Sequence, residues 1–153
     1  MSYQNAKRIC LLLPILFGLS PLASADETTK SLTVYNDAVG DAYVSLDQED
    51  GIGNQILWHS NMQTEAGDVI GISAGHCTRL DAADNFFCTF NIELDGRGII
   101  AGQGVQRTEP LNSIYPITGG TGEFERITGT LVSRPVEDRA RFIYEIAYRL
   151  PEE

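Results

Sequence analysis

Three tyrosines, Tyr115, Tyr144 and Tyr148, carry hydroxyl groups that could donate a hydrogen bond to an oxygen atom of a bound small molecule. A buried tyrosine hydroxyl needs a partner in any case, and another protein group could equally provide it. The two histidines, His59 and His76, are far apart and lack the cysteine and histidine spacing of a zinc site. We therefore expect neither a metal nor a cofactor.

Cysteine pairing is the second chemical feature. Cys77 and Cys88 form an even pair once Cys10 is set aside with the N-terminal segment, which suits an oxidising compartment. The turn-like residues 80–85 lie midway between them, so two strands folding about this turn would place Cys77 opposite Cys88. We expect a cross-strand disulfide that stabilises the fold by roughly 2–3 kcal/mol in the loop-entropy model.

The elements that would position these groups are strands. No long helical periodicity occurs after residue 26, whereas apolar residues alternate with polar ones at a period of two, which predicts an all-β domain. Two alternating faces are rich in aromatic side chains: Phe86, Cys88, Phe90, Ile92 and Leu94, and then Phe142, Tyr144, Ile146 and Tyr148. Each face is either packed core or the wall of a pocket, and Phe90 and Phe142 are candidate ligand contacts together with the tyrosines.

Turn signals divide the chain into short strands. Asp95-Gly96 between two alternating runs is typical of a tight hairpin. This spacing predicts a sandwich or a closed barrel, and closure is favoured because it removes exposed strand edges. The predicted strands are 31–39, 42–46, 56–59, 69–80, 86–94, 97–105, 114–117, 129–133 and 141–149.

A glycine-rich segment follows Tyr115, where Gly119, Gly120, Gly122 and Gly129 interrupt a β-branched and aromatic run. Glycines in such a run suit sharp strand bends, because a residue without Cβ adopts positive φ readily. A phosphate-binding loop is not indicated, since that motif needs Gly-Lys-Ser/Thr at the start of a helix, and Glu-Phe-Glu follows Gly122.

Three segments carry a family resemblance. They are Val69-Ile-Gly-Ile-Ser-Ala-Gly-His-Cys77, Gly98-Ile-Ile-Ala-Gly-Gln-Gly104, and Ile117-Thr-Gly-Gly-Thr-Gly-Glu-Phe124 with Thr128-Gly129. In order and approximate spacing they resemble the plant allene oxide cyclases and the related dirigent proteins, over residues 32–150. The resemblance implies an eight-stranded antiparallel barrel and assembly into trimers, with the outward-facing Phe87 and Ile143 compatible with such a contact.

The same resemblance suggests catalytic residues. Val34-Tyr-Asn-Asp37 is similar to a dirigent strand in which a functional aspartate follows an aromatic residue and an amide, so Asp37 would be an acid or base at the pocket mouth. Its alternative is an aspartate that begins a hairpin turn at residues 38–41. Glu123 follows Gly-Gly-Thr-Gly where some dirigent proteins carry a second acid; alternatively it forms a solvated pair with Arg126.

The match to the cyclases is incomplete. Where they carry a glutamate on the first strand this chain has Asn36, and an amide cannot take up a proton, so literal allene oxide cyclisation is disfavoured. Cys77 matches a cyclase cysteine, but a thiol bound in a disulfide with Cys88 could not act as a donor. Asn61 is a loose counterpart of a cyclase asparagine that holds a substrate oxygen or water.

The N-terminal residues 1–25 predict a cleavable signal peptide. Lys7 and Arg8 precede an apolar run broken by two prolines, and Ala23-Ser-Ala25 suits the cleavage site. We expect residues 26–153 to form one exported barrel domain, secreted or periplasmic. Cleavage removes two of the eleven basic residues and none of the twenty-one acidic ones, so the net charge moves from −10 to −12. Nucleic acid and, after cleavage, membranes are therefore poor partners.

Two functions remain open. In the first, the barrel holds a reactive apolar molecule in one folded conformation and acts as a cofactor-free isomerase, cyclase or stereochemistry-directing protein, in which Asp37 and Glu123 guide proton transfer. In the second, it binds an apolar small molecule, or serves in the envelope or in stress, without chemistry. The aromatic faces are compatible with both.

Overall fold

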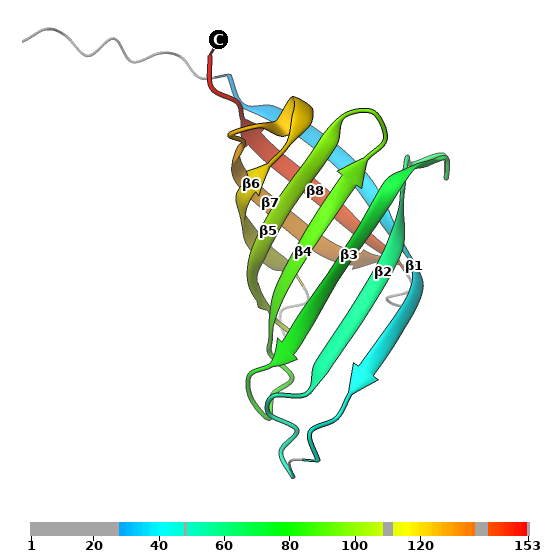
Figure 1. Ribbon diagram of the computed structural model, residues 1–153, viewed down its shortest axis with the longest axis vertical. Helices are drawn as coiled ribbons and strands as arrows, with labels where there is room; N and C mark the ends of the chain where they lie inside the picture. The colour runs from blue at the N-terminus through cyan, green and yellow to red at the C-terminus, as the bar shows by residue number, and fades with distance from the viewer. Residues whose placement is uncertain (1–27, 48, 109–111, 137–140, 153) are drawn as a thin grey trace, which may run out of the picture.

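The computed structural model describes residues 28–47, 49–108, 112–136 and 141–152, and almost all of them lie in strands (Figure 1). The elements in chain order are β1 (Lys30–Val44), β2 (Gln55–Gln63), β3 (Val69–Arg79), β4 (Phe86–Leu94), β5 (Gly98–Gln106), β6 (Ser113–Gly120), the short 3₁₀-helix η1 (Gly122–Phe124), β7 (Thr128–Val136) and β8 (Arg141–Arg149).

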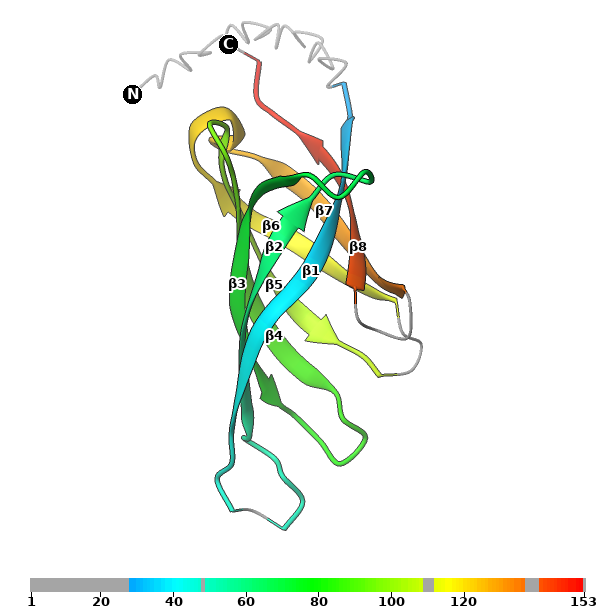
Figure 2. The same ribbon diagram turned by 90° about the vertical axis from the view of Figure 1, so that its right-hand side faces the viewer.

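The strands form one closed antiparallel barrel in sequence order, with β8 pairing back onto β1 (Figures 1 and 2). Each strand therefore has a hydrogen-bonded neighbour on both sides over at least part of its length. Residues 38–44 of β1 are the exception, because they pair with β2 alone. The predicted eight-stranded antiparallel barrel is confirmed. The predicted hairpin is confirmed as well, because Arg97 N–H donates to the Leu94 carbonyl at 3.0 Å and Gly96 has φ 70°.

The alternating faces point inward, as their period of two predicts. Cys88, Phe90, Ile92 and Leu94 of β4 are buried, and so are Tyr144, Ile146 and Tyr148 of β8. The first residue of each face, Phe86 and Phe142, is only partly buried and packs against this core.

β1 differs from its prediction in a way that matters for the site. The sequence predicts two strands, 31–39 and 42–46, whereas the structure has a single strand with a register shift between Ala38 and Gly40. The predicted alternative of a hairpin turn at residues 38–41 is wrong, since this segment is a bulge within a strand. A bulge adds one residue to one strand only, so it reverses which side chains face inward beyond it.

The two ends of the barrel differ. At the end that carries η1, Phe124 is fully buried and its ring contacts the Tyr148 ring, with centroids 5.9 Å apart. Gly122 has φ 63°, and a Cβ there would lie 2.6 Å from the Arg97 carbonyl oxygen. The opposite end, here called the mouth, carries the β1–β2, β3–β4 and β5–β6 loops (Figure 1).

The predicted signal peptide, residues 1–25, lies outside the described residues. Within the described ranges no helix has the length and hydropathy needed to cross a membrane.

Candidate functional site

The mouth half of the barrel encloses a cavity of about 470 Å³. Its size lies within the range of roughly 300–1,000 Å³ that is usual for small-molecule sites. The other half is filled by fully buried side chains such as Ile92, Ile100 and Ile146. The inward alternation thus produces a packed core at the η1 end and an accessible cavity at the mouth.

Aromatic rings form much of the cavity wall. Phe90 packs edge-to-face on Tyr115 with centroids 5.2 Å apart, and its centroid lies 6.4 Å from that of Tyr144. Phe142 and Trp58 complete the aromatic lining. These rings come from β2, β4, β6 and β8, so the closed barrel gathers residues that are distant in sequence.

Glycines on the strands make room for these rings. A Cβ on Gly102 would lie 2.5 Å from Cζ of Phe90, and one on Gly75 would lie 2.8 Å from Cζ2 of Trp58. Both rings therefore occupy space that a side chain at the glycine would need. A larger residue at Gly102 would displace the Phe90 ring, and one at Gly75 would also meet the Thr89 carbonyl oxygen at 2.4 Å.

Two tyrosine hydroxyls face a largely desolvated environment. Burial raises the pKa of Tyr115 to about 12. Burial, and then the neighbouring Tyr115, raise the pKa of Tyr144 above its usual range. Both hydroxyls consequently remain protonated at neutral pH and can donate hydrogen bonds. The Tyr115 hydroxyl lies 3.4 Å from Oε1 of Gln106, which is a weak contact that a bound small molecule could replace.

Neutral polar groups are placed among the rings. Asn36, Ser60, Gln106 and Ser133 line the cavity. The Nδ2 group of Asn36 lies 3.9 Å from Sδ of Met62, which is a weak acceptor. Asn36 thus contributes an uncharged amide, and not a carboxylate, to this wall.

The disulfide forms part of the same wall. Cys77 lies directly opposite Cys88 in the β3–β4 ladder, the two are bonded, and both line the cavity. The predicted cross-strand bridge is present, so the competing interpretation of Cys77 as a free cavity thiol does not hold in this structure. The bridge joins neighbouring strands beside Phe90 and fixes their separation there.

Asp41 is the cavity carboxylate that sequence reasoning missed, and the aromatic Trp58 was missed with it. Beyond the bulge it pairs with Trp58, and both side chains line the cavity, where Asp41 remains exposed to solvent at the mouth. The sequence holds one signal for this: Gly40 inside a strand-like run is typical of a bulge, and a bulge reverses the inward parity.

The two carboxylates singled out from the sequence lie elsewhere. Asp37 is half-buried beside the inward-facing Asn36, and it accepts a hydrogen bond from Nε2 of Gln63 at 3.1 Å without lining the cavity. Asn61, its cross-strand partner, does not line the cavity either. The structure therefore does not gather Asp37 and Asn61 with the tyrosines.

Glu123 lies in η1 and is paired with a cation. Nε and Nη2 of Arg97 donate to its two carboxylate oxygens at 2.8 and 2.9 Å, so its partner is Arg97 and not the predicted Arg126. The Arg97 guanidinium holds the pKa of Glu123 below its usual range. Tyr148 belongs to this end as well, where it packs on Phe124.

One hydrolase-like segment has a structural role. Gly71-Ile-Ser-Ala-Gly75 has the Gly-x-Ser-x-Gly spacing, but it lies within β3, and the buried Ser73 hydroxyl donates to the Asn91 carbonyl at 3.0 Å. A nucleophile elbow requires a sharp strand-to-helix turn that exposes the serine. This serine is therefore not placed for nucleophilic attack. Among the described residues no group of three or more metal-ligating acids, histidines or cysteines occurs.

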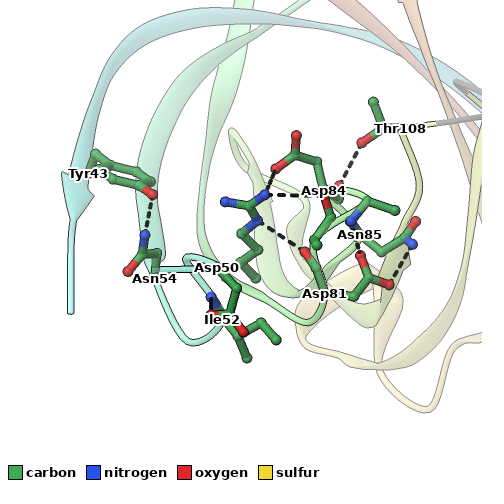
Figure 3. A network of polar contacts seen from close by, with 11 residues as sticks. Tyr43, Asp50, Ile52, Asn54, Asp81, Asp84, Asn85 and Thr108 are labelled. Atoms are coloured by element: carbon green, nitrogen blue, oxygen red, sulfur yellow. Dashed lines mark hydrogen bonds and ion pairs between the residues drawn. The ribbon is translucent and has the colours of Figure 1, made fainter. Parts of the chain in front are cut away.

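Polar contacts hold the mouth loops in place (Figure 3). Asn54 Nδ2 donates to the Tyr43 hydroxyl at 2.5 Å, and Asn54 Oδ1 accepts from Leu46 N–H at 2.8 Å. The Asn54 carbonyl accepts from the Arg79 N–H at 2.8 Å. The β1–β2 loop is thereby joined to the end of β3.

The β3–β4 loop is organised around Asp81 (Figure 3). Asn85 Nδ2 donates to Asp81 Oδ2 at 2.7 Å, and this contact is the main reason that the pKa of Asp81 lies below its usual value. Arg79 pairs with Asp84 at 2.8 Å, and Thr108 donates to the Asp84 carbonyl at 2.6 Å. Described residues of three loops from separate hairpins thus form one framework at the mouth end of the barrel.

The sequence matches no protein-family model and no curated protein. Solved structures with the same fold include a pyocyanin demethylase, 21% identical with a TM-score of 0.69, covering 78% of this chain and 99% of that one. An exo-specific intermolecular Diels-Alderase is 15% identical with a TM-score of 0.64, and the match covers 79% of this chain and 98% of that one. A pterocarpan synthase dirigent protein is 14% identical with a TM-score of 0.67, and the match covers 83% of this chain and 98% of that one.

At these sequence identities the likeness to the three solved structures is one of fold. The chain therefore has the eight-stranded barrel fold of the dirigent proteins and Diels-Alderases, as its resemblance to the allene oxide cyclase and dirigent superfamily predicts.

Proposed function

We propose that this protein holds one apolar organic molecule in the mouth half of the barrel and directs its cyclisation, isomerisation or coupling without a cofactor. The observation that carries the proposal is the aromatic-walled cavity with two protonated tyrosine hydroxyls, Tyr115 and Tyr144, among its lining. Rings of this kind bury the apolar body of a guest, and a few polar groups fix its orientation.

The rate advantage would come from orientation. Holding a flexible molecule in one reactive conformation removes much of the entropic cost of reaching the transition state. The Tyr115 and Tyr144 hydroxyls would donate hydrogen bonds to a carbonyl or phenol oxygen on which negative charge develops. Asp41, at the mouth, is the carboxylate in position to accept a proton from the guest.

The named activities of proteins with this fold support the proposal. Two of these proteins are described as an exo-specific intermolecular Diels-Alderase and a pterocarpan synthase dirigent protein. Pyocyanin demethylase, by its name, acts on a small molecule. A role for the sequence-derived residues Asp37 and Glu123 would have to be indirect, because neither lines the cavity.

The test compares a cavity-filling variant with a matched control. Ala38 lines the cavity, whereas Ala147 is an exposed residue of β8 that does not line it. Native mass spectrometry of purified protein should find a small molecule bound to wild type and to Ala147→Phe but not to Ala38→Phe. Equal retention by Ala38→Phe and wild type would exclude this cavity as the site.

Binding without chemistry is the second candidate. It is favoured by one observation: the acid pair predicted from sequence does not lie in the cavity. The identified guest, incubated with the protein and followed by chiral chromatography, distinguishes the two. Turnover that falls in Tyr115→Phe and Tyr144→Phe while affinity is kept supports chemistry, and an unchanged guest supports binding alone.

We also propose that residues 1–25 direct export to a secreted or periplasmic location. The Cys77–Cys88 disulfide supports this, because such bridges persist in oxidising compartments. Assembly into a trimer stays a prediction; Phe87 is exposed on β4, and Ile143 is half-buried on β8.

A further inference from the structure

The described lining of the cavity carries a single charged group. Among the described residues that line it, Asp41 is the sole carboxylate, and no lysine, arginine or histidine takes part. An anionic guest would find no cation in this wall, whereas a positively charged guest would find a carboxylate at the entrance. The formal net charge of −10 adds a long-range field that attracts cations and repels anions.

Asp41 has no cationic partner within the described part of the chain. The ion pairs found there join other residues: Arg79 with Asp84, Arg97 with Glu123, and Arg134 with Glu145. The Asp41 carboxylate is therefore not already neutralised by a side chain of the described protein, and it is available to a guest.

Trp58 stands beside this carboxylate. It is the cross-strand partner of Asp41, it lines the cavity, and its ring packs against Gly75 of β3. Among aromatic side chains an indole attracts a cation most strongly. The entrance thus combines a carboxylate with an indole on adjacent strands, and the deeper wall offers Phe90, Tyr115 and Tyr144 for an apolar ring system.

From these observations we propose that the guest is a planar apolar ring system that carries one positive charge, and that its charged end lies at the mouth between the Asp41 carboxylate and the Trp58 indole. The inference rests on the proposed function, since it assigns the charge of the molecule that the cavity holds. The flat apolar part would lie against the deeper rings, and the positive ring atom or substituent would stay close to the entrance.

A matched set of three small molecules tests which charge the cavity prefers in its guest. The probes are 1-methylquinolinium, its neutral isostere 1-methylnaphthalene, and the anion 1-naphthoate, with affinities measured by equilibrium dialysis. Trp58 is the single tryptophan of the chain, so a change in its fluorescence locates the bound probe at the cavity. Because the rings are of the same size, differences between the probes report mainly on charge.

Asp41→Asn is compared with Asp37→Asn, which removes the same charge from the same strand outside the cavity. We expect Asp41→Asn to weaken the binding of 1-methylquinolinium about fivefold and to change the binding of 1-methylnaphthalene by less than about twofold. Asp37→Asn should leave the binding of both probes within about twofold of wild type. Trp58→Phe should weaken the binding of 1-methylquinolinium more than that of 1-methylnaphthalene, because a phenyl ring attracts a cation less strongly than an indole does.

Two results would overturn the inference while leaving the proposed function standing: an equal effect of the two aspartate variants on the quinolinium, or naphthoate binding as tightly as the quinolinium. Failure of all three probes to bind, together with no small molecule on the purified protein, would instead count against the proposed function.

Discussion

Asp41 and Trp58 are direct partners in the β1–β2 ladder, and both side chains line the cavity at its mouth. Four positions earlier, Asp37 sits on the same strand and does not line it. The bulge between Ala38 and Gly40 lies between the two aspartates, so one added residue decides which carboxylate faces the cavity.

Gly102 should tolerate no larger residue without loss of stability. A Cβ there would lie 2.5 Å from the Phe90 ring, so Gly102→Ala must displace that ring. We expect a loss of about 1–3 kcal/mol in the free energy of unfolding, the usual cost of overpacking. Urea unfolding measures it. Gly119→Ala is the control, because a Cβ at Gly119 meets nothing within 4 Å; an equal loss in both variants would contradict the ring-displacement argument.

The Cys77–Cys88 bridge should stabilise the barrel. The two cysteines are 11 residues apart, and the loop-entropy model gives roughly 2–3 kcal/mol for a loop of this size. Adding dithiothreitol should lower the urea midpoint of wild type and leave that of the Cys77→Ala/Cys88→Ala variant unchanged. A thiol titration of the denatured, unreduced protein lacking residues 1–25 should detect no free thiol, and two free thiols would rule the bridge out.

Acid should weaken the mouth framework through Asp81. Asn85 lowers the pKa of Asp81 in the folded state below the ordinary value of 3.8. The stabilisation is therefore fully present above pH 3.8 and is lost as the pH falls through the lower folded-state pKa. Wild type should be more stable than Asp81→Asn at neutral pH, with the difference shrinking as the solution is acidified. A difference that stays constant from neutral to strongly acidic pH would exclude Asp81 as its source.

Alkaline pH should lower the stability of the fold through the buried Tyr115. Burial raises the pKa of Tyr115 from 10.0 to about 12, so the folded state holds this proton more tightly than the unfolded state. Stability that is present below pH 10.0 should therefore fall as the pH rises from there towards about 12. Absorbance titration of wild type should show a late phenolate step that Tyr115→Phe reduces, and an unaltered titration in that variant would contradict the assignment.

Much of the fold follows from local patterns in the sequence. Alternation along β4 and β8 identifies Phe90, Tyr144 and Tyr148 as inward-facing, because successive side chains of a strand point to opposite faces. The turn between Cys77 and Cys88 brings the two strands into register, so their pairing could be inferred from the spacing alone. Phe90, Phe142 and Tyr144 face inward as this alternation predicts, and all three line the cavity. Tyr115, which the alternation does not place, lines it as well.

The site depended on longer-range relationships. Tyr148 faces inward like Tyr144, but it lies at the η1 end of the barrel, where Phe124 packs on its ring. Glu123 is paired with Arg97, which is 26 positions away, and no local spacing identifies that partner. Trp58 and Asp41 become neighbours only through the register of β1 on β2.

The amino-acid sequence by itself determined the all-β class, the inward faces of regular strands and the disulfide partners, since each depends on a period of two or on one short turn. Only the tertiary structure decided where the cavity lies and which acid lines it. Pairing of β1 with β8 ends at Asp37, and the register shift between Ala38 and Gly40 follows directly after it. Pairing of β1 with β2 continues beyond the shift to Val44. Whether an added residue is accommodated as a bulge or as a turn depends on the neighbouring strands that the closed barrel supplies.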